Sequence, residues 1–143
     1  MIALFDIDNT LAAAWHRDHL IEAEGWDAFH AAAVEDQPIQ EMVELLSALD
    51  TAGWHIVLLT GRNEKWRNAT MAWLVVNGVA VHELLMRPDE DYRPNADLKL
   101  ALINERWPDL KPQDAIIFED HEKTAEAWRA LGFTTLLVTA YNR

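Results

Sequence analysis

Carboxylates, hydroxyls and bases follow short apolar segments at three places in this sequence. The three groups are Asp6-Ile7-Asp8-Asn9-Thr10, Thr60-Gly61-Arg62 and Glu119-Asp120. One carboxylate can act as a nucleophile, and a second carboxyl group can protonate a leaving oxygen. Carboxylate oxygens are also ligands for Mg²⁺, and hydroxyls and bases bind phosphoryl oxygens. This combination indicates phosphoryl transfer at a site that holds Mg²⁺.

The segments that carry these groups alternate between strand and helix patterns. Short apolar strands are predicted over Ile2–Phe5, His55–Thr60, Val81–Met86, Ala115–Phe118 and Thr135–Val138. Helices are predicted over Ile39–Ala52, Glu64–Asn77, Ala96–Arg106 and Glu122–Leu131. The alternation is typical of an α/β fold whose central parallel sheet is covered on both faces. Because ligands bind beyond the carboxyl ends of such strands, the three groups should form one site.

The four motifs DxDxT, a strand-terminal Thr, a Lys and a late acidic pair resemble those of the haloacid dehalogenase superfamily. The resemblance implies a Rossmann-like three-layer sandwich and an aspartyl-phosphate intermediate. It implies that Asp6 is the nucleophile and that Asp8 is the general acid and base. Thr60 would bind the phosphate, and Lys99 would steady the nucleophile and the phosphoryl group. Mg²⁺ would be held by Asp6, the backbone carbonyl of Asp8, and Asp120.

Further residues near these motifs are candidates for contacts with the substrate. They are Thr10, Gly61, Arg62, Arg87 and Arg93. Arginine can bind phosphate through two parallel hydrogen bonds. The alternative is that the three arginines pair with nearby acids on the surface, where ion pairs contribute little. Asp91 could orient Arg93, contact a sugar hydroxyl, or be an ordinary loop acid.

Residues 38–138 also resemble the 3′-phosphatase domain of T-even phage polynucleotide kinase. The shared features are the Thr60-Gly61-Arg62 turn, the segment 87–93 that leads to Lys99, and the run from Glu119 to Val138. The resemblance implies a phosphomonoesterase that acts on a nucleotide or a nucleic-acid 3′-phosphate end. A phosphatase of small metabolites or 5′-nucleotides is the first alternative. A catalytically degenerate binding protein is the second.

The chain of 143 residues is predicted to form one phosphatase domain with an insertion after its first strand. Residues 11–37 form this alanine-rich insertion, which is predicted to be helical. It would be either a packed connection or a small cap over the site. Trp15 and Trp26 lie in it and are candidates for a platform on which a base stacks. Four other tryptophans are interpreted as packing residues, namely Trp54, Trp66, Trp73 and Trp128.

The net charge of −12 is concentrated at the amino-terminal end, where residues 1–61 carry one base, Arg17, against 11 acids. This distribution argues against an extended nucleic-acid surface, but a few bases could hold a single phosphate. The absence of cysteine excludes disulfides and thiolate metal sites. No apolar run approaches the length of a membrane span, and the stretch before Asp6 is too short for a signal peptide. A cytoplasmic location is therefore expected, in the host cytoplasm if a phage encodes the chain.

Overall fold

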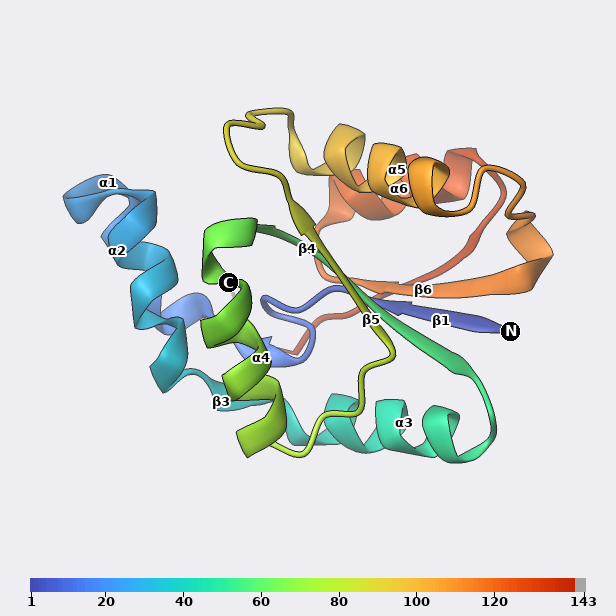
Figure 1. Cartoon of the computed structure of the whole chain (residues 1–143), viewed down its shortest axis with the longest axis horizontal. Helices are drawn as coiled ribbons and strands as arrows, with labels where there is room; N and C mark the ends of the chain where they lie inside the picture. Colours follow the sequence, from blue (N-terminus) through green and yellow to red (C-terminus); the bar gives the residue numbers. More distant parts are fainter. Residues whose placement is uncertain (141–143) are drawn as a thin grey trace.

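A five-stranded parallel sheet forms the centre of the protein, and the computed structural model describes residues 1–140 (Figure 1). The strand order is β5-β4-β1-β6-β7. The strands are β1 (Ile2–Phe5), β4 (His55–Asn63), β5 (Glu83–Arg87), β6 (Ala115–Glu119) and β7 (Thr134–Leu137). The chain reverses its direction of strand addition after β5, so β1 lies between β4 and β6. The prediction of a parallel α/β sheet is confirmed.

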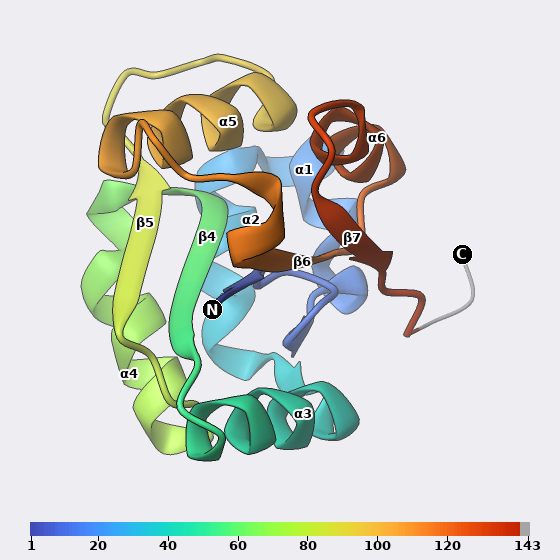
Figure 2. The same cartoon turned by 90° about the vertical axis from the view of Figure 1, so that its right-hand side faces the viewer.

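Helices cover both faces of the sheet, as Figure 2 shows in the view along it. One layer contains α3 (Gln40–Thr51) and α4 (Arg67–Val76), and the other contains α5 (Asn95–Arg106) and α6 (Glu122–Ala130). Alternate residues of β1 supply the two cores, because successive strand residues point to opposite faces. Phe5 packs with the α3 and α4 side chains, whereas Leu4 packs with Trp128 of α6.

The predicted elements match the observed ones closely, with two local differences. Strand β4 continues past Thr60 to Asn63, and its pairing with β5 changes register between Leu59 and Asn63. The helix predicted from Glu64 begins as a 3₁₀ turn, η3 (Glu64–Trp66), before α4. The irregular end of β4 thus carries the Thr60-Gly61-Arg62 turn to the carboxyl edge of the sheet.

The insertion after β1 contains helices, as predicted, and also a short ribbon that was not predicted. Its helical elements are η1 (Trp15–Arg17), α1 (His19–Glu24), α2 (Trp26–Ala31) and η2 (Ala32–Glu35). Its ends, β2 (Ala12–Ala13) and β3 (Gln37–Pro38), pair antiparallel. This pairing brings the two ends of the insertion together.

A tight turn at Asn9 starts the insertion. Asn9 has a φ of 63°, in the left-handed region that asparagine tolerates. Its side-chain oxygen accepts a hydrogen bond from the Ala14 backbone N–H at 3.0 Å. This turn lets Asp6 and Asp8 face the same side of the sheet edge. Within residues 1–140, no helix combines the length and the apolar character that crossing a membrane would need.

Candidate active site

A cleft of about 800 Å³ opens at the carboxyl ends of β1, β4 and β6. Nine of the ten predicted site residues line it, namely Asp6, Asp8, Thr60, Gly61, Arg62, Arg87, Arg93, Lys99 and Asp120. The tenth, Thr10, is fully buried behind Asp6 and is not among the lining residues. The sheet therefore gathers residues from positions 6 to 120 of the sequence into one place.

Asp6 is held rigidly at the floor of this cleft, with 7% of its surface exposed. The Lys99 ammonium lies 2.8 Å from Asp6 Oδ1, and the Thr10 hydroxyl donates a hydrogen bond to Asp6 Oδ2 at 3.3 Å. The backbone N–H of Asp6 donates a hydrogen bond to the Phe118 carbonyl at 3.0 Å, which extends the β1–β6 pairing. These contacts fix the carboxylate in one orientation, which a nucleophile requires. Thr10 thus contacts the predicted nucleophile.

Lys99 joins Asp6 to Glu119, whose Oε2 lies 2.6 Å from the same ammonium nitrogen. Burial alone would lower the pKa of Lys99, but Asp6 and Glu119 more than offset it, so the pKa lies above its ordinary value. The lysine therefore stays charged in the cleft. Glu119 was predicted only as part of an acidic pair, and its contact with Lys99 depends on the packing of α5 against the sheet.

The carboxylates of Asp6, Glu119 and Asp120 form a cluster in which one oxygen atom of each lies within 4.8 Å of the others. Burial and the charge of Glu119 raise the pKa of Asp6 well above its ordinary value, and burial also raises that of Asp120. One lysine does not balance three acids. The cluster therefore offers the hard oxygen ligands and the excess negative charge that suit a divalent cation such as Mg²⁺.

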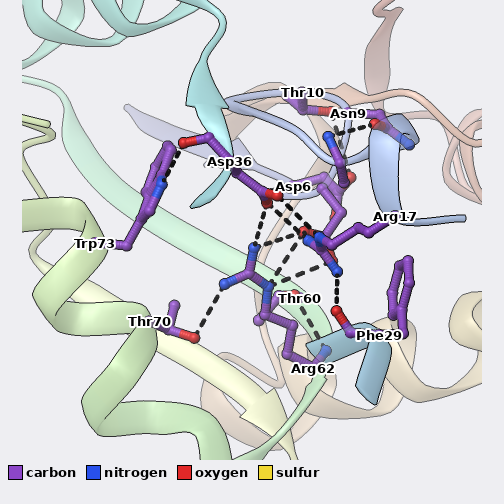
Figure 3. A network of polar contacts seen from close by, with 12 residues as sticks. Asp6, Asn9, Thr10, Arg17, Phe29, Asp36, Thr60, Arg62, Thr70 and Trp73 are labelled. Atoms are coloured by element: carbon purple, nitrogen blue, oxygen red, sulfur yellow. Dashed lines mark hydrogen bonds and ion pairs between the residues drawn. The ribbon is translucent and has the colours of Figure 1, made fainter. Parts of the chain in front are cut away.

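Asp8 is held between the guanidinium groups of Arg17 and Arg62. Figure 3 shows these two arginines converging with Asp36 in one polar network. Arg62 Nη2 lies 2.6 Å and Arg17 Nη2 lies 2.7 Å from Asp8 Oδ1. Burial would raise the pKa of Asp8, but Arg62 and Arg17 hold it well below its usual range. Arg62 lines the cleft beside Asp8, where it could contact an anionic group of a substrate, whereas Arg17 is buried and does not line the cleft.

Arg17 was not predicted as a site residue. It is fully buried, with 1% of its surface exposed. Its Nε and Nη2 atoms contact Asp36 at 2.9 and 2.8 Å, and its Nη1 donates to the Phe29 carbonyl at 3.0 Å. Its guanidinium also lies over the Phe29 ring, 4.2 Å from the ring centre. The signal that could have identified it was its position as the one base among residues 1–61.

The Thr60-Gly61-Arg62 turn is shaped by its own contacts. The Thr60 hydroxyl accepts a hydrogen bond from the Arg62 backbone N–H at 3.1 Å. A Cβ atom at Gly61 would lie 2.4 Å from the Asn95 side-chain oxygen, so glycine permits this close approach. Arg62 is buried and paired with Asp8, which shows that its alternative interpretation as a surface charge is wrong.

Arg87 and Arg93 have different environments at the rim of the cleft. The Arg87 guanidinium donates to the Gly61, Asp91 and Arg93 carbonyls and to the Asn95 side chain, at 2.7–3.0 Å. It thus ties the 88–94 loop to the Thr60-Gly61-Arg62 turn. Arg93 is half exposed and forms a bidentate ion pair with Asp91, so Asp91 orients Arg93, as one of the alternatives predicted.

Comparison with known proteins gives a family and a fold. The family model that describes the phosphatase domain of polynucleotide kinase PNKP matches residues 1–142. No match was found among curated proteins. A chain of the Pnkp1/Rnl/Hen1 complex superimposes with a TM-score of 0.81 at 23% identity, over 96% of this chain and 44% of that chain. This chain therefore spans less than half of that relative.

Two further solved structures share the fold at lower identity. A haloacid dehalogenase-like hydrolase from Streptococcus pneumoniae has a TM-score of 0.71 at 15% identity, over 95% of this chain and 83% of that one. A β-phosphoglucomutase from Thermotoga maritima, described as putative, has a TM-score of 0.68 at 15% identity, over 100% of this chain and 88% of that one. At these identities the likeness concerns the fold alone.

Proposed function

Because the chain belongs to the family of PNKP phosphatase domains, which is part of the haloacid dehalogenase superfamily, we propose that it hydrolyses nucleotide or nucleic-acid 3′-phosphate ends. The chain is a phosphoric monoester hydrolase, and the proposal concerns its substrate and mechanism. The observation that carries it is the cleft shared by Asp6, Asp8 and Arg62, in which Asp8 pairs with Arg62 and with the buried Arg17. A carboxylate nucleophile, a second carboxyl group and a cation that could bind phosphate thus line one small volume.

In the first step, one carboxylate oxygen of Asp6 attacks the phosphorus atom in line with the bond to the leaving oxygen. The new Asp6–phosphorus bond forms as that bond breaks, and Asp8 transfers its proton to the departing alkoxide. A phosphate that takes up the hydrogen bonds of Arg62, which lines the cleft, would withdraw this partner from Asp8. Asp8 could then carry the proton that this step needs.

In the second step, water attacks the phosphorus atom of the aspartyl-phosphate. Asp8 removes a proton from this water, and the bond between phosphorus and Asp6 breaks, so that inorganic phosphate is released and both carboxyl groups return to their starting state. Lys99 and Thr60 would donate hydrogen bonds to the phosphoryl oxygens in both steps. The contact of Lys99 with Asp6 supports this role.

We assign a Mg²⁺ site to Asp6, Asp120 and the backbone carbonyl of Asp8. When bound, Mg²⁺ supplies the positive charge that lets an anionic phosphate approach an anionic nucleophile. Glu119 is nearby, but its Oε1 accepts a hydrogen bond from the His121 N–H and its Oε2 contacts Lys99. It therefore orients the lysine and adds negative charge around the site.

Magnesium should stabilise the folded protein. At a Mg²⁺ concentration about 100 times its dissociation constant, binding contributes about 2.7 kcal/mol, which raises the thermal unfolding midpoint by on the order of 5–10 °C. Tryptophan fluorescence during heating, with Mg²⁺ or with a chelator, would measure this shift. Asp120→Asn should lose most of it, and Asp109→Asn, at an exposed position, should keep it. An equal shift in all three proteins would contradict the assigned ligands.

The cleft volume favours a substrate larger than a simple phosphate. A volume of about 800 Å³ lies in the range of about 300–1,000 Å³ that holds drug-sized ligands. We therefore expect Mg²⁺-dependent phosphate release from 3′-phosphorylated oligonucleotides and 3′-nucleoside monophosphates, with kcat/KM at least about ten-fold above that for 5′-nucleotides and sugar phosphates. Phosphate release from a matched panel, with a chelator control, measures this. A preference for 5′-nucleotides or sugar phosphates would keep the chemistry and overturn the substrate.

A further inference from the structure

An exposed tryptophan stands at the mouth of the cleft. Trp26 is 60% exposed, although it lies at the start of α2 and lines the same cleft as Asp6 and Asp8. Figure 1 shows α1 and α2 at the end of the molecule where β4 finishes. Other large aromatic side chains, such as Trp73 and Trp128, pack in the core. The exposure of Trp26 therefore leaves a flat aromatic surface available beside the site.

The ring of Trp26 is supported from behind by other aromatic side chains. It stacks on His30 with ring centres 6.0 Å apart and meets the Phe29 ring edge-on at 5.5 Å. Burial lowers the pKa of His30 to about 4, so this ring is neutral near pH 7. A supported ring loses little conformational freedom when a ligand binds to it, which favours affinity.

The same support connects Trp26 to Arg17, the buried partner of Asp8. Arg17 contacts Asp8 through Nη2, and it contacts Phe29 through both the ring and the backbone carbonyl. Asp27, the residue after Trp26, forms an exposed ion pair of 2.6 Å with Lys65 of η3, the turn that follows β4. The aromatic surface is thus fixed relative to the position where a phosphate would bind.

Two buried polar atoms lie in this aromatic cluster without a partner. Within residues 1–140, the buried side-chain nitrogens that lack a hydrogen bond are His30 Nδ1 and Trp66 Nε1, and the two rings are neighbours with centres 6.2 Å apart. Unsatisfied buried polar atoms weaken a fold, and native proteins contain few of them. Their presence at this point indicates that the cluster is not optimised for stability alone.

We propose that the exposed face of Trp26 stacks with the nucleobase of the terminal nucleotide whose phosphate reaches Asp6. This stacking role of Trp26 rests on the proposed function, and it specifies that the insertion recognises the terminal base of the substrate. Stacking suits every base, because each has a π face, so the platform would accept ends of different sequence. It also needs no extended basic surface, which agrees with the acidic amino-terminal region.

The test combines a change in the protein with a change in the substrate. The substrates are a 3′-phosphorylated oligonucleotide, the same oligonucleotide lacking only its terminal base, and p-nitrophenyl phosphate. Loss of one base–aromatic stack typically costs about five- to a hundred-fold in affinity. We expect Trp26→Ala to lower kcat/KM by about ten-fold on the complete oligonucleotide and by less than about two-fold on the other two substrates. Trp26→Phe should restore part of the loss, and Trp26→Leu less.

Trp15→Ala is the matched control, because Trp15 lies in the same insertion but is not among the residues that line the cleft. It should leave all three kinetic values within about two-fold of the unsubstituted protein. An equal loss on all substrates in Trp26→Ala, or no loss on any, would overturn the platform while the phosphatase assignment stands. No phosphate release from either oligonucleotide by the unsubstituted protein, with p-nitrophenyl phosphate hydrolysed, would overturn the proposed substrate and the platform together.

Discussion

Asp6→Asn should abolish turnover and leave the protein folded. An amide oxygen is a far weaker nucleophile than a carboxylate, so we expect kcat to fall by about 10⁴-fold or more. The fold should tolerate the change, because asparagine has nearly the same shape and Lys99 keeps its contact with Glu119. Phosphate release and circular dichroism on the same sample would measure both properties. Activity near that of the unsubstituted protein would contradict the mechanism.

The same substitution should not destabilise the metal-free protein. Burial and Glu119 raise the pKa of Asp6 well above its ordinary value, which means that the ionised form of Asp6 is unfavourable in the fold. Replacing it with a neutral side chain relieves this repulsion. The unfolding midpoint of Asp6→Asn in a chelator should therefore equal or exceed that of the unsubstituted protein. This combination of lost activity and retained stability separates a chemical role from a structural one.

Asp8→Asn provides the complementary control. It keeps Asp6, the proposed nucleophile, and removes the proposed proton carrier. A leaving group such as p-nitrophenolate departs without a proton, so the aspartyl-phosphate should still form from p-nitrophenyl phosphate. Its hydrolysis should slow more than its formation, because the attacking water then lacks a base. Mass spectrometry of the stopped reaction should then detect a protein that carries one extra phosphoryl group. Asp6→Asn should show no such species.

The sequence was sufficient to predict the floor of this site because its residues lie in short motifs at strand ends. Asp6 and Asp8 are set by one turn at Asn9, and Asp120 follows β6 directly. In a parallel sheet the carboxyl ends of the strands lie at one edge, so motifs that follow different strands in the sequence lie close together in the fold. The strand and helix ranges could be predicted for the same reason, since each is a continuous apolar pattern.

The insertion could not be predicted in the same way, because its side chains act through contacts far apart in sequence. Arg17 and Asp36 lie 19 residues apart, near the two ends of the insertion, and meet only when the β2–β3 ribbon closes. Nothing in the spacing of these two residues marks them as partners. The alanine-rich composition of residues 11–37 indicated helices but contained no period that would place Arg17 beside Asp8.

Asp36 has a fully buried side chain and holds Arg17 through two hydrogen bonds. Its Oδ1 accepts from Arg17 Nε and His16 Nε2, its Oδ2 accepts from Arg17 Nη2, and Arg62 Nη2 lies 3.7 Å away. Its backbone carbonyl also accepts a hydrogen bond from Trp73 Nε1 at 2.9 Å, which anchors this residue to α4. We infer that Asp36 positions Arg17 and has no contact with the reacting atoms.

Asp36→Asn should therefore cost both stability and activity. Removing one partner from a buried ion-pair network leaves a buried charge uncompensated, which typically costs about 3–5 kcal/mol. We expect the unfolding midpoint to fall by on the order of 10 °C. Because a small displacement of a positioning cation can lower rates by about 100-fold, kcat/KM should fall by a similar factor at temperatures where the variant is folded.

Three readouts separate this positioning role from a general loss of structure. Inhibition by inorganic phosphate should weaken in Asp36→Asn, because Arg17 no longer fixes Asp8, the partner of the cleft-lining Arg62. Stabilisation by Mg²⁺ should persist, because Asp36 is not in the Asp6, Glu119 and Asp120 cluster. His16→Ala removes a half-exposed partner of the same carboxylate and should cost less than about 1 kcal/mol. If phosphate inhibition stays unchanged in Asp36→Asn while stability falls, Asp36 supports the insertion without positioning Arg17 for the substrate.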